Sequence, residues 1–387
     1  MVPGEPGSLQ ELVGGRALEI EALPLKLMIV TNAPLCSGAE EHLKDLSLWL
    51  TEEGVEVAFL VRRGGILHKT LPGDRFDMYP IDRDGPRAIF SINQTFSAIL
   101  SASPHVVSIN REHDILPTYA ALKLAAPFLK KKPRVVSVFH TPTGRKLPLL
   151  NKMDGILFTS AYTRDAFLSR NMGLADLSTV IHYGIELFDL EVELKLDPHR
   201  ERRYFGGRGF PIIGMVGELW KNQVELVEVA SHLVDKFPDL TVALVGGGNA
   251  PQMEAIEKRA SKLGLSNNIL LTGRVDRGRI HEIYYDMDLS VSTHRNEGFG
   301  IVHIESLAAL TPVVAYRSGG YVEMLKRGGG FLVEGGPVEL AGAIDKLLSD
   351  EEKRCSLAKE GRNLVEGSYT REVMGKNHLA YYERIRG

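Results

Sequence analysis

The stretch HRNEGFGIVHIESLAALTPVVAYRSGG (residues 294–320) contains, in order, a glycine turn, an apolar pattern of helical period, a proline and a short β-like run. Loop, helix and strand in this succession are typical of a parallel α/β sheet. Two carboxylates, Glu297 and Glu305, stand eight positions apart around the turn. A carboxylate among the apolar residues of such a helix is costly unless it has a partner. The stretch therefore predicts an α/β fold and a binding site at the start of the helix.

The same alternation of strands and helices extends along the chain in two blocks. Buried strands are expected at short apolar runs bounded by turn residues. In the first block these runs are 25–30, 55–61, 105–109, 134–139, 155–159 and 178–183. In the second block they are 211–216, 241–247, 268–273, 288–293, 312–316 and 330–333. Helical patterns such as 115–130 and 161–170 lie between several of the runs. The pattern predicts two doubly wound, Rossmann-like domains that face an interdomain cleft.

The length of 387 residues also favours two domains, because single cores seldom grow this large. The segment 185–210 is charged, contains glycine and lacks apolar periodicity, so it is predicted to be the interdomain linker. The predicted organisation is then a poorly ordered leader, an N-terminal domain, this linker, a C-terminal domain and a final helix that can cross back to the N-terminal domain. Their bounds are 1–24, 25–184, 185–210, 211–370 and 371–387.

Composition limits the class of function. Hydrophobic residues make up 44% and charged residues 25% of the chain, as in ordinary globular proteins, and the net charge of −3 argues against a nucleic-acid partner. Cys36 and Cys355 support neither a disulfide framework nor a metal cluster and fit a reducing compartment. The N-terminus lacks a signal-peptide pattern, so the expected location is cytoplasmic. Lysines 130–132 end an apolar helix; a solvated helix end is the main interpretation, and peripheral contact with the inner membrane surface is the alternative.

Several smaller motifs each allow two interpretations. Gly246–Gly248 end a strand, and they either expose amides to a phosphate or only make a tight turn. Gly38 follows the first strand and allows the same two interpretations. Asp286 and Asp288 resemble metal-binding aspartates, but capping and solvation at a helix–strand junction is the more natural role. We therefore expect no metal site.

The segment SVFHTPTGRKL (137–147) follows a predicted strand and so lies at the cleft edge of its sheet. His140 there can hold a substrate hydroxyl or stabilise developing charge, with Thr141 beside it. Arg145 and Lys146 can contact an anionic acceptor. A solvated basic turn with an ordinary histidine is the alternative.

The stretch that opens the helix carries the sharper hypothesis. Gly298 and Gly300 let the backbone approach a ligand closely, and the helix that begins near Gly300 presents free amides and the positive end of its dipole, which favours a diphosphate. Glu305 is placed to accept hydrogen bonds from vicinal ribose hydroxyls. Glu297 can take a sugar hydroxyl.

The segment EGFGIVHIESLAALTPVVAYRSGGYVEML (297–325) resembles the E-x7-E signature of the retaining GT-B glycosyltransferases of the glycosyltransferase 4 family. SGAEEHLKDLSLWLTEEGVEVAFL, VVSVFHTPTGRKL, VIHYGIELFDL, GMVGELWKNQ and LTGRVDRGRIHEIYYDMDLSVSTH are similar to further segments of that family. The resemblance implies a GT-B fold, with 211–370 binding a UDP- or GDP-linked sugar as co-substrate and 25–184 on the acceptor side. It also implies no cofactor and no metal. The acceptor class stays open among sugars, lipid-linked molecules and small molecules.

The resemblance further implies roles for individual residues. It assigns donor contacts to Gly38, Lys221, Arg274, Val275, Glu297, Gly298, Phe299, Gly300, Ile301 and Glu305. Among these, Lys221 would neutralise the diphosphate and Arg274 would lie near the base. It makes His140, Glu297 and Lys221 the catalytic residues, and Thr141, Arg145 and Lys146 remain the candidates for the acceptor.

Three departures from the family pattern stand out. Glu218 occupies the position of an arginine that, in the family, shares the diphosphate with the lysine. A carboxylate facing a diphosphate is repulsive, so Glu218 is expected to point elsewhere or another cation to replace the arginine. Ser37 and Leu310 stand where glycines are common.

The sequence thus predicts a retaining glycosyltransferase that uses a front-face displacement, with the leaving phosphate stabilised by Lys221 and the helix start. Two alternatives stay open at this point. A nucleotide-sugar epimerase or hydrolase can be built on the same fold. Glu218 makes a non-catalytic nucleotide-sugar-binding subunit the other alternative.

Overall fold

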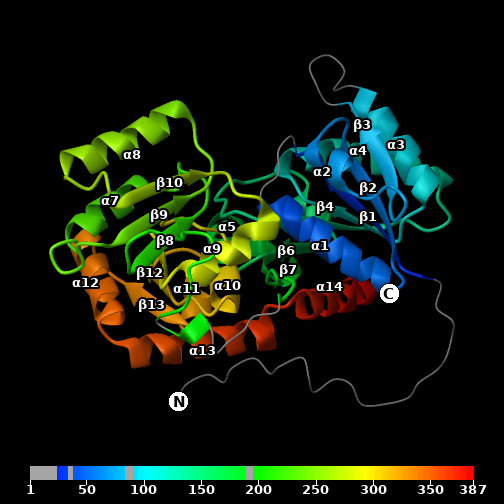
Figure 1. Cartoon of the computed structure of the whole chain (residues 1–387). Coiled ribbons are helices and arrows are strands. Elements are labelled where there is room, and N and C mark those ends of the chain that lie inside the picture. The colour runs from blue at the N-terminus through cyan, green and yellow to red at the C-terminus, as the bar shows by residue number, and fades with distance from the viewer. Residues whose placement is uncertain (1–23, 34–37, 83–89, 189–194, 198) are drawn as a thin grey trace, which may run out of the picture.

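The computed structural model describes residues 24–33, 38–82, 90–188, 195–197 and 199–387. The predicted leader and Ser37 lie outside these residues. Two parallel sheets, each covered by helices on both faces, form the two halves of the molecule (Figure 1). The predicted α/β class with two Rossmann-like domains is therefore confirmed.

The N-terminal half contains a seven-stranded parallel sheet in the order β3-β2-β1-β4-β5-β6-β7. Its strands are β1 Lys26–Thr31, β2 Glu56–Arg62, β3 Asp77–Ile81, β4 Val106–Ile109, β5 Arg134–Phe139, β6 Gly155–Phe158 and β7 Ser178–Val180. Its helices are α1 Gly38–Glu52, α2 Ile66–Thr70, α3 Phe90–Ala102, α4 Ile115–Ala125 and α5 Ala161–Asn171. The strand order reverses between β1 and β4, and ligands of open α/β sheets bind beyond the carboxyl ends of the strands at such a point.

The C-terminal half contains a six-stranded parallel sheet in the order β10-β9-β8-β11-β12-β13. Its strands are β8 Ile212–Val216, β9 Thr241–Val245, β10 Ile269–Gly273, β11 Leu289–Ser292, β12 Val313–Tyr316 and β13 Gly330–Val333. Its helices are α7 Val224–Ser231, α8 Ala250–Lys262, α9 Ile280–Asp286, α10 Ile301–Ala308, α11 Tyr321–Leu325, α12 Pro337–Leu348 and α13 Glu351–Ser368. The order reverses between β8 and β11, so the loop after β11 lies at the second switch point.

All the predicted strands are present, and their ends shift by at most three residues. The sequence prediction missed β3, an edge strand that pairs only with β2. It carries Pro80, which is tolerated at an edge, and its side chains are mostly half-buried, so it lacks a continuous apolar run. The predicted helix 115–130 ends at Ala125 and continues as a 3-10 turn to Phe128.

The aspartates at the α9–β11 junction are not solvated, and that part of the prediction is wrong. The Asp286 carboxylate accepts hydrogen bonds from the backbone amides of Arg203, Tyr204 and Phe205 at 2.9, 2.6 and 2.7 Å. Asp288 accepts hydrogen bonds from the guanidinium groups of Arg200 and Arg202 and from the Ile212 amide. Both aspartates are buried, so their burial is compensated by these donors. Their role is to fasten residues 200–212 to the C-terminal half.

Lys195 explains why the predicted linker is rich in charge. Its ammonium group is buried and donates to the carbonyls of Tyr284, Tyr285 and Met287 at 2.9, 2.7 and 2.7 Å. A buried ammonium needs such partners. Together with Arg200 and Arg202, which donate to Asp288, Lys195 therefore anchors this segment to the C-terminal half.

The helix α14 (Arg371–Arg386) lies beneath α1 of the N-terminal half (Figure 1). Gly375 of α14 packs directly on the Trp49 ring, where a Cβ atom has no room. The chain thus returns from the C-terminal half and closes on the first helix. Within the described residues, no helix is long and apolar enough to span a bilayer.

Candidate functional site

The loop between β11 and α10 lies where the two halves meet. A Cβ atom at Gly298 would stand 2.5 Å from the carbonyl oxygen of His140, at the end of β5. The Ser160 hydroxyl, at the start of α5, donates to the Gly298 carbonyl at 2.5 Å. Gly300 adopts φ 92°, a left-handed conformation that favours glycine. The two glycines therefore allow the close contact and the turn that begins α10.

The N-terminus of α10 is open, unlike that of α8. The N-cap of α10 is Gly300, which has no side chain to cap the first amides. In α8 the Asn249 side chain accepts a hydrogen bond from the Gln252 amide, and the Gln252 side-chain oxygen accepts one from the Asn249 amide. Free amides and the helix dipole favour an anion. Of these two helix starts, the one beside Glu297 is the better anion site.

The glycines 246–248 are explained by packing. A Cβ atom at Gly246 would overlap the Gly217 carbonyl, and one at Gly248 would stand 2.5 Å from Leu219 Cδ1. At Gly247 it would stand 2.5 Å from Arg274 Nε. Of the two interpretations, the tight turn with close contacts accounts for all three positions.

Glu297 is paired with Lys221 in this structure. The Lys221 ammonium donates to Glu297 Oε2 at 2.6 Å. Burial raises the pKa of Glu297, but the Lys221 charge and hydrogen bond outweigh it and leave the pKa below its ordinary value. Lys221 comes from the loop after β8 and Glu297 from the loop after β11, the strands at the switch point. The two side chains assigned to diphosphate and sugar are thus neighbours.

Glu305 is buried one and a half turns into α10. Its residue is 7% exposed, and burial raises its pKa to about 7, with Asp45 and Glu41 adding to the rise and Arg277 opposing it. The Arg277 guanidinium lies 3.3 Å from Glu305 Oε1. A buried carboxylate at the start of an uncapped helix suits a ligand with hydroxyl donors.

Gly38, at the start of α1, and Ile301, at the start of α10, lie close together where the two halves meet. A Cβ atom at Gly38 would stand 3.2 Å from Ile301 Cδ1. Phe299, by contrast, is 1% exposed and packs edge-to-face on Tyr183 at 5.3 Å between ring centroids. Its side chain belongs to the core, so only its backbone is available to a ligand.

His140 has a protein partner at each ring nitrogen. Nδ1 lies 2.6 Å from the Tyr183 hydroxyl, and Nε2 lies 3.2 Å from Asn110 Oδ1. The Asn110 amide group donates to Ser108, which turns its oxygen toward the ring. Nε2 therefore carries the proton, and Nδ1 accepts from the tyrosine.

Burial, with Arg111 and His378 nearby, lowers the pKa of His140 to about 3. The ring is neutral at ordinary pH. A neutral ring can bind a hydroxyl but brings no positive charge to the site. Of the two roles expected from the sequence, its neutral state favours holding a substrate hydroxyl over stabilising developing charge.

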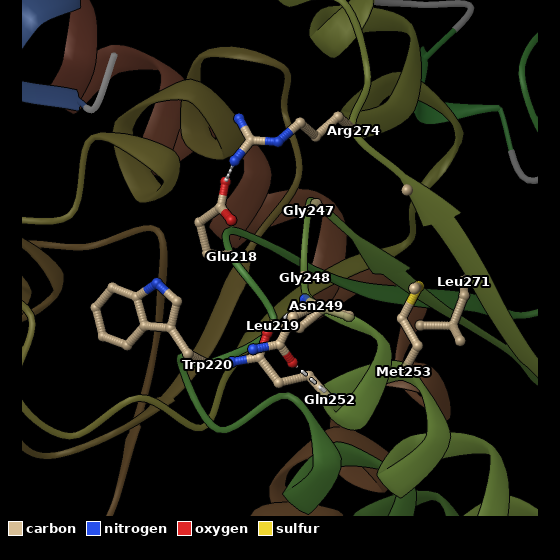
Figure 2. Close-up of a pocket in the computed structure, with 12 residues that line it drawn as sticks. Glu218, Leu219, Trp220, Gly247, Gly248, Asn249, Gln252, Met253, Leu271 and Arg274 are labelled. Atoms are coloured by element: carbon tan, nitrogen blue, oxygen red, sulfur yellow. Dashed lines mark hydrogen bonds and ion pairs between the residues drawn. The ribbon is translucent and has the colours of Figure 1, made fainter. Parts of the chain in front are cut away.

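A pocket of about 400 Å³ opens at the carboxyl ends of β8, β9 and β10. Figure 2 shows Glu218 and Arg274 meeting above Gly247, with Trp220 on one side and Met253 and Leu271 on the other. Glu218 Oε1 and Arg274 Nη2 are 2.8 Å apart. The carboxylate at the expected arginine position is therefore neutralised by an arginine from the loop after β10.

Among the residues assigned to the donor, Arg274 lines this pocket. Val275, the next residue, packs against the cluster that contains Ile283 and Tyr284.

Arg145 lies beside the C-terminal end of α5, where its carbonyl accepts from the Asn171 side chain. Thr141 instead lies against Gly298 at the start of that helix. Helix geometry makes the two ends of α5 about 16 Å apart, so the exposed Arg145 and Lys146 are not brought to the loop at Glu297.

Three residues of the site were missed from the sequence. Asn110 follows β4 at the carboxyl edge of the sheet, and this position was a usable signal. Tyr183 and Arg277 gave no local signal, because their partners are distant in the sequence.

Comparison with known proteins identifies the family of this chain. A family model described as "Glycosyl transferases group 1" matches residues 206–364, and one described as "Glycosyltransferase Family 4" matches residues 36–187. The chain belongs to the GT-B glycosyltransferases of family 4. The two models meet near the junction of the two halves; one covers the C-terminal sheet and the other covers the N-terminal sheet from β2 onward.

Individual family members are moderately similar. The D-inositol 3-phosphate glycosyltransferase of Corynebacterium urealyticum is 32% identical over 181 residues, 43% of this chain and 43% of that protein. The GDP-mannose-dependent alpha-(1-6)-phosphatidylinositol monomannoside mannosyltransferase of Mycolicibacterium smegmatis is 29% identical over 227 residues, 55% of this chain and 58% of that protein. The chain thus spans about half the length of the curated relatives it matches.

Solved structures support the GT-B fold. A glycosyltransferase from Rickettsia africae has a TM-score of 0.79 at 21% identity, covering 94% of this chain and 98% of its own. Anabaena Alr3699/HepE in complex with UDP-glucose has a TM-score of 0.75 at 18% identity, covering 93% and 100%. At these identities the likeness concerns the fold alone.

Proposed function

We propose that this chain transfers a sugar from a UDP- or GDP-linked donor to an acceptor, with retention at the anomeric carbon. The observation that carries the proposal is the α10 start, where uncapped amides lie beside the Lys221–Glu297 pair and the buried Glu305, and where the loop before α10 meets the N-terminal half. The amides and Lys221 suit the diphosphate, Glu297 suits a sugar hydroxyl, and Glu305 suits the ribose hydroxyls. Named relatives use nucleotide sugars, GDP-mannose among them.

The mechanism follows from the charges present. Lys221 and the α10 amides stabilise the leaving diphosphate, whose oxygen takes the proton of the attacking acceptor hydroxyl on the same face of the sugar. Because Lys221 holds the Glu297 carboxylate, Glu297 is better suited to a hydrogen bond with the transferred sugar than to nucleophilic attack on it. Neutral His140 donates Nε2–H to a sugar hydroxyl in exchange for its 3.2 Å bond to Asn110. We expect turnover without added metal and unchanged activity in EDTA.

The Glu218–Arg274 pair bears on the non-catalytic alternative. That alternative depended on an uncompensated carboxylate at the diphosphate, and Arg274 compensates it. Catalysis is therefore the favoured proposal. An epimerase or hydrolase would consume donor at full rate without acceptor, whereas a transferase hydrolyses its donor slowly.

The decisive experiment uses Glu305→Ala. Losing the carboxylate should weaken UDP or GDP binding by about 1–3 kcal/mol, because charged hydrogen bonds to the ribose are lost. Calorimetry measures the affinity, and mass spectrometry of products from an acceptor extract measures transfer. Glu334→Ala is the matched control, since Glu334 is 81% exposed and pairs with Arg317. Unchanged nucleotide affinity in a folded Glu305→Ala variant would sink the donor-site assignment.

Peripheral contact with an anionic membrane is proposed at the face formed by α4 and the turn that follows it. Leu116, Leu124 and Phe128 are 61, 54 and 70% exposed, and the exposed lysines 130–132 follow them. Apolar side chains beside lysines suit an anionic lipid surface. This face would give access to a lipid-linked acceptor.

The membrane proposal is tested by co-sedimentation with vesicles that contain or lack anionic lipid. Binding should require anionic lipid and fall at least several-fold in Phe128→Ser. Met172→Ser is the control, since Met172 is 79% exposed on another helix. Equal sedimentation of the wild type with both vesicles, or equal binding by Phe128→Ser, contradicts the proposal.

A further inference from the structure

Arg277 stands among three carboxylates at the meeting of the two halves. It begins the 3-10 turn Arg277–Arg279 that follows β10. Its guanidinium lies 3.3 Å from Glu305 on α10, and 3.5 and 3.9 Å from Glu41 and Asp45 on α1. Arg277 therefore links Glu305, the carboxylate assigned to the ribose, to α1 of the N-terminal half.

Glu305 needs this neighbour because it is deeply placed. Its side chain is 10% exposed, whereas Arg277 is 45% exposed. The groups that face it are Arg277 from the turn, Asp45 and Glu41 from α1, and Tyr284 from α9. Two of these four are carboxylates, and within the described residues Arg277 is the cation at ion-pair distance from Glu305.

We propose that Arg277 is a positioning residue that keeps the Glu305 carboxylate ionised and oriented, so that it accepts hydrogen bonds from both vicinal hydroxyls of a nucleoside diphosphate. This inference rests on the proposed function. An ionised carboxylate is an acceptor at both oxygens, whereas a protonated one turns one oxygen into a donor and loses half of that match.

The balance of charges makes Arg277 decisive. With Arg277 present, the pKa of Glu305 is about 7, so the group is divided between its two forms near neutral pH. Removing the guanidinium leaves burial and two acidic neighbours, all of which favour the protonated form. Removing Asp45 has the opposite effect, because one of the acidic neighbours disappears.

The first measurement needs no nucleotide. Infrared difference titration of the wild type against Glu305→Gln isolates the carboxyl signal of Glu305 and gives its midpoint. The midpoint should rise by about one pH unit or more in Arg277→Gln, stay near that of the wild type in Arg277→Lys, and fall in Asp45→Asn. Arg279→Gln is the matched control, since Arg279 pairs with Glu282 at 2.8 Å and should leave the midpoint unchanged.

The second measurement is the affinity for UDP and GDP between pH 6 and 9. At pH 7, Arg277→Gln should bind about ten-fold more weakly than the wild type, and it should recover toward wild-type affinity at pH 9. Glu305→Gln should bind weakly with no such recovery.

The outcomes separate the two proposals. An unchanged midpoint in Arg277→Gln overturns the positioning role. An equal loss of nucleotide affinity at every pH overturns it as well, because such a loss indicates direct contact with the nucleotide or a structural defect. A midpoint shift in Arg277→Gln, together with binding restored at high pH, supports it. Absence of UDP and GDP binding to the wild type at every pH overturns the proposed function and the ribose role of Glu305 with it.

Discussion

The Lys221 ammonium and the Glu297 carboxylate lie 2.6 Å apart, each from a loop that follows a central strand of the C-terminal sheet. Glu225 and Arg295 form a second bridge between the same two loop regions, at 3.0 Å. An incoming diphosphate must share Lys221 with Glu297. The pair therefore keeps the lysine in place while its charge is still available to a more negative ligand.

Replacing Lys221 by Met should weaken UDP or GDP binding by about 1.5–3 kcal/mol, because a charged hydrogen bond to the diphosphate is lost. It should also raise the pKa of Glu297, whose burial is no longer opposed. Calorimetry at constant pH measures the affinity. Lys262→Met, at an exposed site on α8, is the control. Wild-type affinity in Lys221→Met would remove the lysine from the diphosphate site.

Tyr183→Phe should lower turnover about 2- to 10-fold, the effect of one neutral hydrogen bond of about 0.5–1.5 kcal/mol. The ring stays packed on Phe299 while His140 loses the hydroxyl that donates to Nδ1. Nucleotide affinity should not change. Steady-state kinetics beside calorimetry separates the two effects, and Tyr79→Phe, whose hydroxyl bonds Ser101 at the far sheet edge, is the control. A loss of nucleotide affinity equal to the loss of turnover would contradict this role.

Gly298→Ala should lower both turnover and stability, because its Cβ would stand 2.5 Å from the His140 carbonyl. The loop must then withdraw from β5, at a cost of about 1–3 kcal/mol. Thermal unfolding and kinetics measure the two losses. Gly173→Ala is the control, since no heavy atom lies within 4 Å of a Cβ there. Full activity in Gly298→Ala would show that the close contact is dispensable.

The fold was predictable because parallel strands are apolar runs, and the site was predictable in part because glycines and carboxylates gather in one segment. Leu310, flagged as a departure from glycine, still has a left-handed φ of 55°, so the backbone keeps the conformation that favours glycine. Asn110 had a usable signal in its place at the end of a strand, but Tyr183 and Arg277 could not be found, because their partners lie 43 and 28 positions away. The role of Lys195 could not be found either, because the buried carbonyls that it meets lie 89 to 92 positions away.

Asp286→Ala should destabilise the C-terminal half by about 2–4 kcal/mol, because three buried amides lose a charged acceptor. Denaturant unfolding measures the free energy, and Asp235→Ala on the surface is the control. A loss below about 0.5 kcal/mol, typical of a surface site, would contradict the anchoring role.

Acid should destabilise the N-terminal half through buried histidines. Burial lowers the pKa of His140 to about 3 and that of His378 to about 4, and it also lowers that of His42, which lies between them. Below pH 6.5 the unfolded chain binds protons at these groups while the folded chain does not, so the stability falls as the pH drops from 6.5 toward 4.

The expected loss is about 1.4 kcal/mol per pH unit for each such histidine. Denaturant unfolding between pH 7.5 and 4.5 measures it. In His378→Gln the fall in stability with decreasing pH should be smaller by up to about 1.4 kcal/mol per pH unit. In His199→Gln, at an exposed site, the fall should equal that of the wild type. A His378→Gln curve parallel to the wild type throughout this range would show that His378 takes up a proton in the folded state without cost.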